Sequence, residues 1–341
     1  MKRVTLKEVA AEAGISISCT ARALKGRAGI SNATRERVRA IADKLGYRPD
    51  PILSALATYR ESRRKKAFQG TIAYLANHSS ELECLASLQS GDPFHGARER
   101  AAMLGYQLRY FPLNDLLDSP ERFWKRLRNQ GIQGVLIRSF PVETACIPPS
   151  PTGFHCVDLF SQPHSVTVST VSSNHAQSME LVLMHLKKSG YEKPALILNT
   201  RISTILHHGW RMAFSVSAQN FKKMLHFNHE EFPVSESSLT QWIGLHRPDA
   251  LLFCYSEDHM PGAKILSRWH REGIASLCMD LLDPDCGIAG IYQDRKLAGA
   301  EALSLLHGML MAGGLVVVRP PTATLIPGTW MEGNQRIPRD P

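Results

Sequence analysis

Two short helices separated by only two residues are predicted at the amino terminus of this 341-residue chain. Thr5 and Glu8 have the spacing of a capping box, and apolar residues follow at i, i+3, i+4 and i+7 on one helical face. Gly14 ends this helix and Ser16 is placed to cap the next one, which leaves Gly14 and Ile15 as the whole connection. So short a connection forces a steep crossing, as in a helix-turn-helix unit.

A third helix is predicted between Ser31 and Gly46, with apolar residues again at i, i+3, i+4 and i+7. These residues are Val38, Ile41, Ala42 and Leu45. Together with Thr20, Ala23 and Leu24 of the second helix, they predict a small three-helix core.

The outward face of the second helix is polar, because Ser18, Arg22 and Lys25 recur at i, i+4 and i+7. A polar helical stripe of this kind fits the major groove of DNA. Arg22 is the best candidate for base recognition, since its planar fork can donate two hydrogen bonds to guanine O6 and N7. Ile17 can face either the groove or the core.

Positive charge is concentrated in this part of the chain. Residues 1–66 hold sixteen Lys and Arg against six Asp and Glu, whereas the remaining residues hold 24 against 25. A basic segment on a nearly neutral body is typical of a module that binds a polyanion. An exposed basic helix can also be merely a solvated face, but the capping box, the tight turn and the charge all indicate DNA binding.

Three stretches, VTLKEVAAEAGIS, TARALKG and ISNATRERVRAIADKLGYRPD, resemble the amino-terminal domain of LacI-type (lactose repressor/galactose repressor) transcription factors over about fifty residues. The resemblance implies base contacts by Ile17, Ser18 and Arg22. It implies phosphate contacts by Thr5, Ser16, Ser31 and Thr34. The segment Cys19–Arg22 departs from the usual Thr-Val-Ser-Arg, so the operator preference of relatives does not transfer.

A short hinge helix is predicted after Pro49, because Asp50 can cap it and Pro51 suits its first position. A helix this short needs a partner. The resemblance implies that the hinge helices of two protomers enter the minor groove and that Leu56 is inserted between base pairs. Alternatively, Leu53 and Leu56 pack on the body. The bases from Arg60 to Lys66 either touch phosphates or remain solvated.

From Gly70 onward, short apolar runs alternate with amphipathic helices, a pattern that predicts doubly wound parallel sheets with helices on both faces. The predicted strands are Thr71–Ala76, Gln107–Phe111, Gly134–Ile137, His155–Phe160, Ala195–Leu198, Ala250–Cys254 and Ile288–Tyr292. The predicted helices are Gly96–Leu104, Pro120–Gln130, Ala176–Ser189, His208–Gln219, Leu239–His246, Gly262–Glu272 and Lys296–Met311.

The body of the chain resembles the two-lobed periplasmic-binding-protein type 1 sensor domain of the same family in scattered short motifs, such as Gly209-Trp210-Arg211 and Tyr292-Gln293-Asp294. The expected fold is therefore an all-α helix-turn-helix head followed by an α/β two-lobed domain. Expected boundaries are 1–49 for the head, 50–66 for the hinge helix and basic linker, and 67–335 for the effector-binding and dimerisation domain.

The resemblance implies a small effector, often a sugar or a nucleobase, in a cleft between the lobes. Leu206 and Asn174 stand where many relatives carry a ligand-binding arginine and an aspartate. The effector-binding candidates are His207, Trp210, Glu257, Asp258 and Asp280. Each of them can equally be a helix cap, a surface charge or a core residue.

Enzymatic motifs are absent: the chain has no GxSxG, GxxxxGK, GxGxxG or HExxH. The segment His226–Glu231 has metal-like spacing but is interpreted as a solvated polar loop, so neither a metal nor a cofactor is expected. Seven cysteines without a CxxC pair indicate reduced thiols, and no targeting or membrane-spanning segment is evident.

These features favour a cytoplasmic, homodimeric transcription factor, a repressor in the leading interpretation. It would bind a palindromic double-stranded DNA operator, respond to a small effector such as a carbohydrate, and not associate with a membrane. One alternative is a sugar-modifying enzyme with an acquired DNA-binding head. The other is a DNA-binding regulator without an effector.

Overall fold

The computed structural model describes residues 4–24, 30–47, 70–77, 92–138, 153–160, 168–205, 208–217, 220–231, 233–311 and 321–334. The predicted hinge helix and basic run, with Leu56, lie outside the described residues, as do Lys25, Leu206 and His207.

The head consists of α1 (Leu6–Ala13), α2 (Ile17–Leu24) and α3 (Asn32–Leu45). Both halves of the predicted capping box are present, since Thr5 Oγ1 accepts from Glu8 N and the Glu8 carboxylate accepts from Thr5 N. Gly14 and Gly46 end α1 and α3 in the left-handed conformation. The core is as predicted, with Val9, Ala13, Ala23, Val38 and Ala42 buried together.

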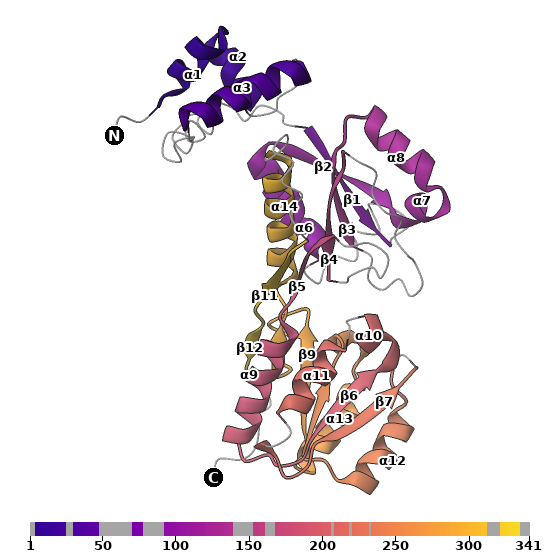
Figure 1. The fold of residues 1–341 in the computed structure, drawn as a ribbon. Coiled ribbons are helices and arrows are strands. Elements are labelled where there is room, and N and C mark those ends of the chain that lie inside the picture. The colour runs from indigo at the N-terminus through magenta and orange to yellow at the C-terminus, as the bar shows by residue number, and fades with distance from the viewer. Residues whose placement is uncertain are drawn as a thin grey trace.

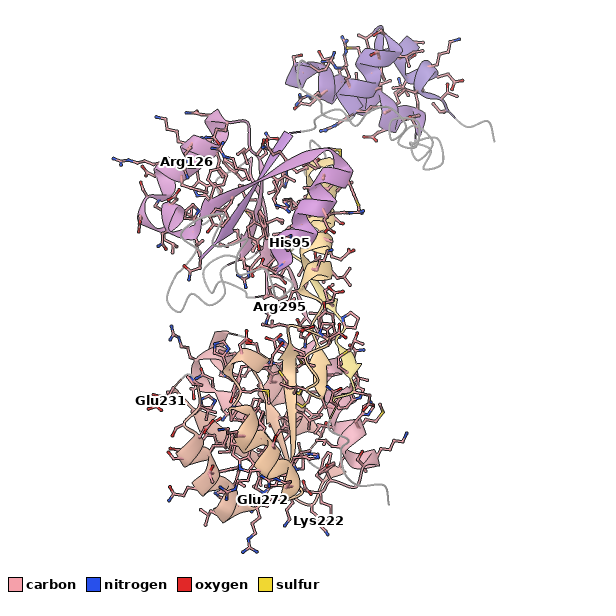
Figure 2. The ribbon with its side chains drawn as sticks, turned by 180° about the vertical axis from the view of Figure 1, so that it is seen from behind. His95, Arg126, Lys222, Glu231, Glu272 and Arg295 are labelled. Atoms are coloured by element: carbon pink, nitrogen blue, oxygen red, sulfur yellow. The ribbon has the colours of Figure 1, made fainter. Side chains whose placement is uncertain are left out.

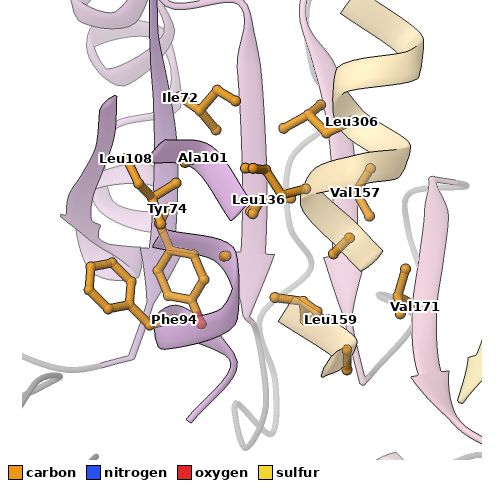
Figure 3. Packing of buried hydrophobic residues seen from close by; sticks show 14 of the residues in the cluster. Ile72, Tyr74, Phe94, Ala101, Leu108, Leu136, Val157, Leu159, Val171 and Leu306 are labelled. Carbon is orange, nitrogen blue, oxygen red and sulfur yellow. The ribbon is translucent and has the colours of Figure 1, made fainter. Parts of the chain in front are cut away.

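The first lobe, here called the N-lobe, contains a six-stranded parallel sheet of order β11-β5-β4-β3-β1-β2 (Figure 1). Its strands are β1 (Gly70–Ala76), β2 (Tyr106–Pro112), β3 (Gly134–Arg138), β4 (His155–Leu159), β5 (Ser169–Ser173) and β11 (Ala323–Ile326). Helices α6 (Pro93–Leu104) and α14 (Arg295–Met311) cover one face, whereas α7 (Leu113–Asp118) and α8 (Pro120–Asn129) cover the other. Figure 3 shows Leu306 of α14 packed over Leu136 and Val157 in the first of these cores.

The second lobe, here called the C-lobe, contains a sheet of order β12-β10-β9-β8-β6-β7, parallel except for the β10–β12 pair. Its strands are β6 (Pro194–Asn199), β7 (Leu225–His229), β8 (Ala250–Phe253), β9 (Ala275–Leu281), β10 (Gly290–Tyr292) and β12 (Thr329–Met331). Helices α9 (His175–Lys188) and α11 (Gly209–Val216) pack on one face. Helices α12 (Glu236–His246) and α13 (Ala263–Arg271) pack on the other, and the short helices α10 (Thr200–Ile205) and η3 (Glu257–His259) follow β6 and β8.

The chain crosses between the lobes three times, from β5 to α9, from β10 to α14 and from β11 to β12. Asn174 N donates to Ile326 O at 2.7 Å, which ties the first crossing to the third. Because the first two crossings leave parallel strands at their carboxyl ends, the carboxyl ends of the two sheets face each other (Figure 1). Open α/β sheets bind ligands at this edge.

Two glycines set the distance between α6 and α14. A Cβ atom built on Gly96 would lie 1.7 Å from Lys296 O, and one built on Gly299 would lie 1.8 Å from Pro93 O. The backbones therefore touch at this crossing, and only glycine fits at either position. The contact fixes the start of α14, and with it Arg295, at the junction of the lobes.

The predicted fold class is confirmed, and the seven predicted strands and seven predicted helices of the body end within three residues of those observed. Strands β5, β7, β9, β11 and β12 were not predicted. The interpretation of His226–Glu231 as a solvated loop is wrong for most of its length, because Leu225–His229 forms edge strand β7, parallel to β6. The His226 ring lies edge-on to Phe214, with ring centroids 5.2 Å apart.

Candidate DNA-binding face and interlobe site

The structure orients α2 with one side buried and one side exposed. Thr20 and Ala23 are fully buried, and Thr20 Oγ1 donates to Ser16 O at 3.0 Å. The opposite side presents Ser18 and Arg22 to solvent. Ile17, which the sequence left between groove and core, is 48% exposed and so belongs to this outer face.

The hydroxyl residues expected to contact phosphates stand at helix starts. Ser16 Oγ accepts from Cys19 N at 3.1 Å, and Ser31 Oγ accepts from Thr34 N at 3.3 Å. The Thr34 hydroxyl lies 2.8 Å from that of Ser31. Thr5 Oγ1 donates to Glu8 Oε2 at 2.9 Å, so this hydroxyl proton is already engaged. The amide groups at such helix starts are suited to bind phosphate oxygens.

An ion pair lies where the carboxyl edge of the C-lobe sheet meets the start of α14. Arg295 Nη2 is 2.6 Å from Asp280 Oδ2, and about a quarter of each side chain is exposed, 21% and 26% respectively. Asp280 is near the end of β9 and Arg295 is the first residue of α14. Figure 2 shows Arg295 between the two lobes.

His175, the first residue of α9, packs against Trp210, with ring centroids 4.3 Å apart. Burial lowers the pKa of His175 from 6.5 to about 4, although the nearby Asp280 carboxylate opposes this shift. The ring is therefore neutral at pH 7. Trp210 is only 3% exposed and belongs to the C-lobe core, so the His175 ring packs on a core side chain.

The other two described effector candidates are placed differently. The Glu257 carboxylate accepts from Leu282 N and Asp283 N at 2.9 to 3.0 Å, which holds the loop after β9. Asp258 is exposed on η3. His175 thus lies near Asp280 and packs against Trp210, which brings these two candidates to one place. Glu257 instead holds the loop after β9 by hydrogen bonds to its backbone.

Three polar residues at the interlobe edges were not among the sequence candidates: Arg295, His175 and Arg138. Arg138 ends β3, and its Nη1 is 3.3 Å from Asp92 Oδ2 at the start of α6. Each lobe therefore places an Arg–Asp pair at the carboxyl edge of its sheet. The rule that ligands bind at this edge could have indicated both residues, since Arg138 directly follows one predicted strand and Arg295 comes three residues after another.

A cavity of about 520 Å³ lies elsewhere in the C-lobe, beside α13. Its walls include Met260, Leu266, Cys286, Ile288 and Asn334. Neither Asp280 nor Arg295 lines it, so this cavity is separate from the interlobe ion pair.

Within the described part of the chain, no cluster of three or more His, Cys, Asp or Glu side chains could hold a metal ion. No described helix is both long and apolar enough to cross a membrane. Burial raises the pKa of the Cys254 and Cys278 thiols, as expected for unreactive core cysteines.

Residues 5–50 match the family model described as bacterial regulatory proteins, lacI family. No curated protein matches the chain in sequence. Similar solved structures cover nearly the whole chain. The lac repressor dimer bound to operator and the anti-inducer ONPF is 19% identical with a TM-score of 0.56, over 98% of this chain and 99% of that one.

The transcriptional regulator CelR in complex with cellobiose is also 19% identical, with a TM-score of 0.57 over 98% of this chain and 100% of that one. The regulator CCPA from Weissella paramesenteroides with bound glucose is 15% identical, with a TM-score of 0.54 over 78% of this chain and 97% of that one. At these identities the likeness is one of fold.

Proposed function

Because residues 5–50 match the lacI family model and the fold is that of the lac repressor, we propose that the chain is a LacI-family transcriptional regulator. It binds a palindromic operator as a homodimer in the cytoplasm, and a small effector between its lobes changes its operator affinity. The exposed face of α2, with Ile17, Ser18 and Arg22 opposite the buried Thr20 and Ala23, is the observation that carries this proposal. Regulators of this family are not enzymes, so the enzyme alternative is set aside.

In this proposal α2 lies in the major groove. Arg22 donates to a guanine, Ile17 and Ser18 make neighbouring base contacts, and Lys25 extends the polar stripe. The starts of the three head helices, at Thr5, Ser16 and Ser31 with Thr34, lie against phosphates and fix the position of α2 on the duplex. Segment 50–66 supplies the minor-groove contact, with Leu56 as the wedge between base pairs.

The effector part of the proposal rests on the interlobe edges. Each lobe places an Arg–Asp pair at its edge, Arg138 with Asp92 and Arg295 with Asp280, and three chain crossings connect the lobes. Similar regulators have been solved with cellobiose and glucose bound. Effector binding that favours one lobe arrangement would alter how residues 50–66 are presented and repress or release transcription, with a coupling of about 1–3 kcal/mol.

The palindromic operator follows from the two-fold symmetry of the proposed homodimer. We place the second copy at the cavity beside α13, because it is a hollow C-lobe surface whose mixed walls include apolar Met260, Leu266 and Ile288 together with Glu257. The domain boundaries proposed are the head at 1–49, the hinge and linker at 50–66, and the effector-binding and dimerisation domain at 67–335.

Selection of bound duplexes from a random pool tests the DNA-binding part. The expected product is one inverted-repeat sequence whose affinity falls steeply with salt, as counterions are released from the phosphates. Failure to bind any duplex at low salt would refute the proposal. The alternative of a regulator without an effector is tested by adding small molecules to the complex of protein and selected operator. Such a regulator would show no change in operator affinity with any of them.

A further inference from the structure

We propose that the ligand of the interlobe site is a sugar acid, a polyhydroxylated molecule whose carboxylate is held by Arg295, rather than a neutral sugar. This inference rests on the proposed effector function and specifies its ligand. It comes from the Arg295–Asp280 ion pair and its position between the lobes (Figure 2).

The pair changes what Asp280 can offer to a ligand. A free carboxylate near the end of β9 would accept hydrogen bonds from the hydroxyl groups of a neutral sugar. Here Asp280 Oδ2 already accepts from Arg295 Nη2 at 2.6 Å, a short charge-assisted hydrogen bond. Asp280 keeps this counter-charge role when a ligand binds, and its Oδ1 can still accept from ligand hydroxyl groups.

The guanidinium also retains hydrogen-bonding capacity, and it alone of the pair carries a positive charge that a ligand carboxylate can match. Asp280 engages only Nη2 among the donors of Arg295, and the side chain is 21% exposed. The planar fork has further N–H groups directed away from this bond, and a carboxylate matches them in a bidentate arrangement. Arg295 also stands at the amino-terminal end of a 17-residue helix, where the helix dipole adds to the positive potential.

The surroundings are consistent with an anionic group next to Arg295. The neighbouring His175 ring is neutral, so Arg295 supplies the positive charge for the ligand carboxylate. Asp294 is engaged as the cap of α14, since its Oδ1 accepts from Leu297 N at 2.8 Å. On the N-lobe side, Arg138 stands at the corresponding edge beside Asp92. The ligand carboxylate would thus join Asp280 on the same guanidinium, and its hydroxyl groups would extend toward the N-lobe.

The test compares acid and neutral members of matched sugar pairs. The full-length protein is titrated with D-glucuronate against D-glucose and with D-galacturonate against D-galactose at constant ionic strength, and the melting temperature and calorimetric affinity are measured. At least one acid is expected to raise the melting temperature, since a ligand that binds only the folded state stabilises it. Its neutral partner is expected to bind at least ten-fold more weakly.

Variant Arg295→Ala should lose the response to the acid, with at least a ten-fold drop in affinity. Arg126→Ala is the matched control, because Arg126 also forms a 2.6 Å pair, with Asp115, but on the outer helices of the N-lobe (Figure 2). This control should keep the full response. Comparing each variant with and without ligand removes any change in its own stability.

Two results would overturn the inference while leaving the proposed effector function intact. One is a neutral sugar that stabilises as strongly as its acid. The other is an acid response that survives in Arg295→Ala. Absence of a response to both acids would also overturn it. The proposed DNA-binding function is tested separately, by the selection of operator duplexes.

Discussion

Arg295 Nη2 lies 2.6 Å from Asp280 Oδ2, and this ion pair joins the first residue of a helix in the N-lobe to a strand of the C-lobe. Helix α14 packs on β3, β4 and β5, whereas β9 is central in the other sheet. The ion pair therefore bridges the two lobes, and a movement of one lobe relative to the other would change its length.

A double-mutant cycle on Arg295→Ala and Asp280→Ala should give a coupling energy of about 1 kcal/mol in urea unfolding, since the pair is partly buried but still solvated. The matched pair Arg126 and Asp115 has the same length but is 43% and 38% exposed. Its coupling should be below about 0.5 kcal/mol. Equal couplings for the two pairs would contradict a special role of the junction.

Replacement of Arg22 should separate sequence recognition from general attraction to DNA. Arg22→Lys keeps the positive charge but loses the planar fork, so binding to random duplex should remain while discrimination for the operator falls by about 1–3 kcal/mol. Competition binding with operator and scrambled duplexes measures the ratio. If this variant still discriminates operator from scrambled duplex as the wild type does, base recognition depends on Ile17 and Ser18 instead.

Two glycines of the same helix should respond to alanine in opposite directions. At Gly299 a new Cβ would lie 1.8 Å from Pro93 O, so Gly299→Ala should destabilise the protein by about 2 kcal/mol or more. At Gly308 nothing lies within 4 Å, and alanine there should stabilise by about 0.5–1 kcal/mol. Thermal unfolding of both variants checks the pair, and a harmless Gly299→Ala would refute the close helix crossing.

His175 should make the protein less stable in acid. Its pKa is about 4 in the folded state against 6.5 in the unfolded chain, so the unfolded chain binds more protons between these pH values. Stability therefore falls as pH drops from about 6.5 toward 4, by at most about 3 kcal/mol from this residue. His175→Phe keeps a ring against Trp210 but cannot titrate, so its free energy of unfolding should depend less on pH between about 4 and 6.5. An unaltered profile would count against the buried, neutral ring.

The dimer surface can be tested with two apolar residues on opposite faces of the C-lobe. Leu266→Glu places a charge in the wall of the cavity beside α13 and should shift the protein toward monomer in light scattering. Met184→Glu is the control, because Met184 is 58% exposed on α9 at the other face. Dissociation by the Met184 variant alone would assign the interface to α9.

Local patterns along the chain predicted most of the secondary structure. The capping box at Thr5 and Glu8, the stop at Gly14 and the helical stripes depend on neighbours within a few residues, so they are visible in sequence. The alternation of apolar runs and helices likewise predicted parallel sheets. Strand β7 was missed because it is an edge strand with exposed His226 and Asn228, which gives it the composition of a loop.

The sequence by itself determined the three helices of the head and the alternating α/β pattern of the body, because these follow from short-range periodicity and capping. Only the tertiary structure decided which polar side chains meet. Asp280 and Arg295 are separated by a loop and strand β10. Their contact requires the start of α14, which the Gly96 and Gly299 crossing positions within the N-lobe, to meet the end of β9 in the C-lobe sheet. Such a meeting depends on packing between distant segments, which no local pattern records.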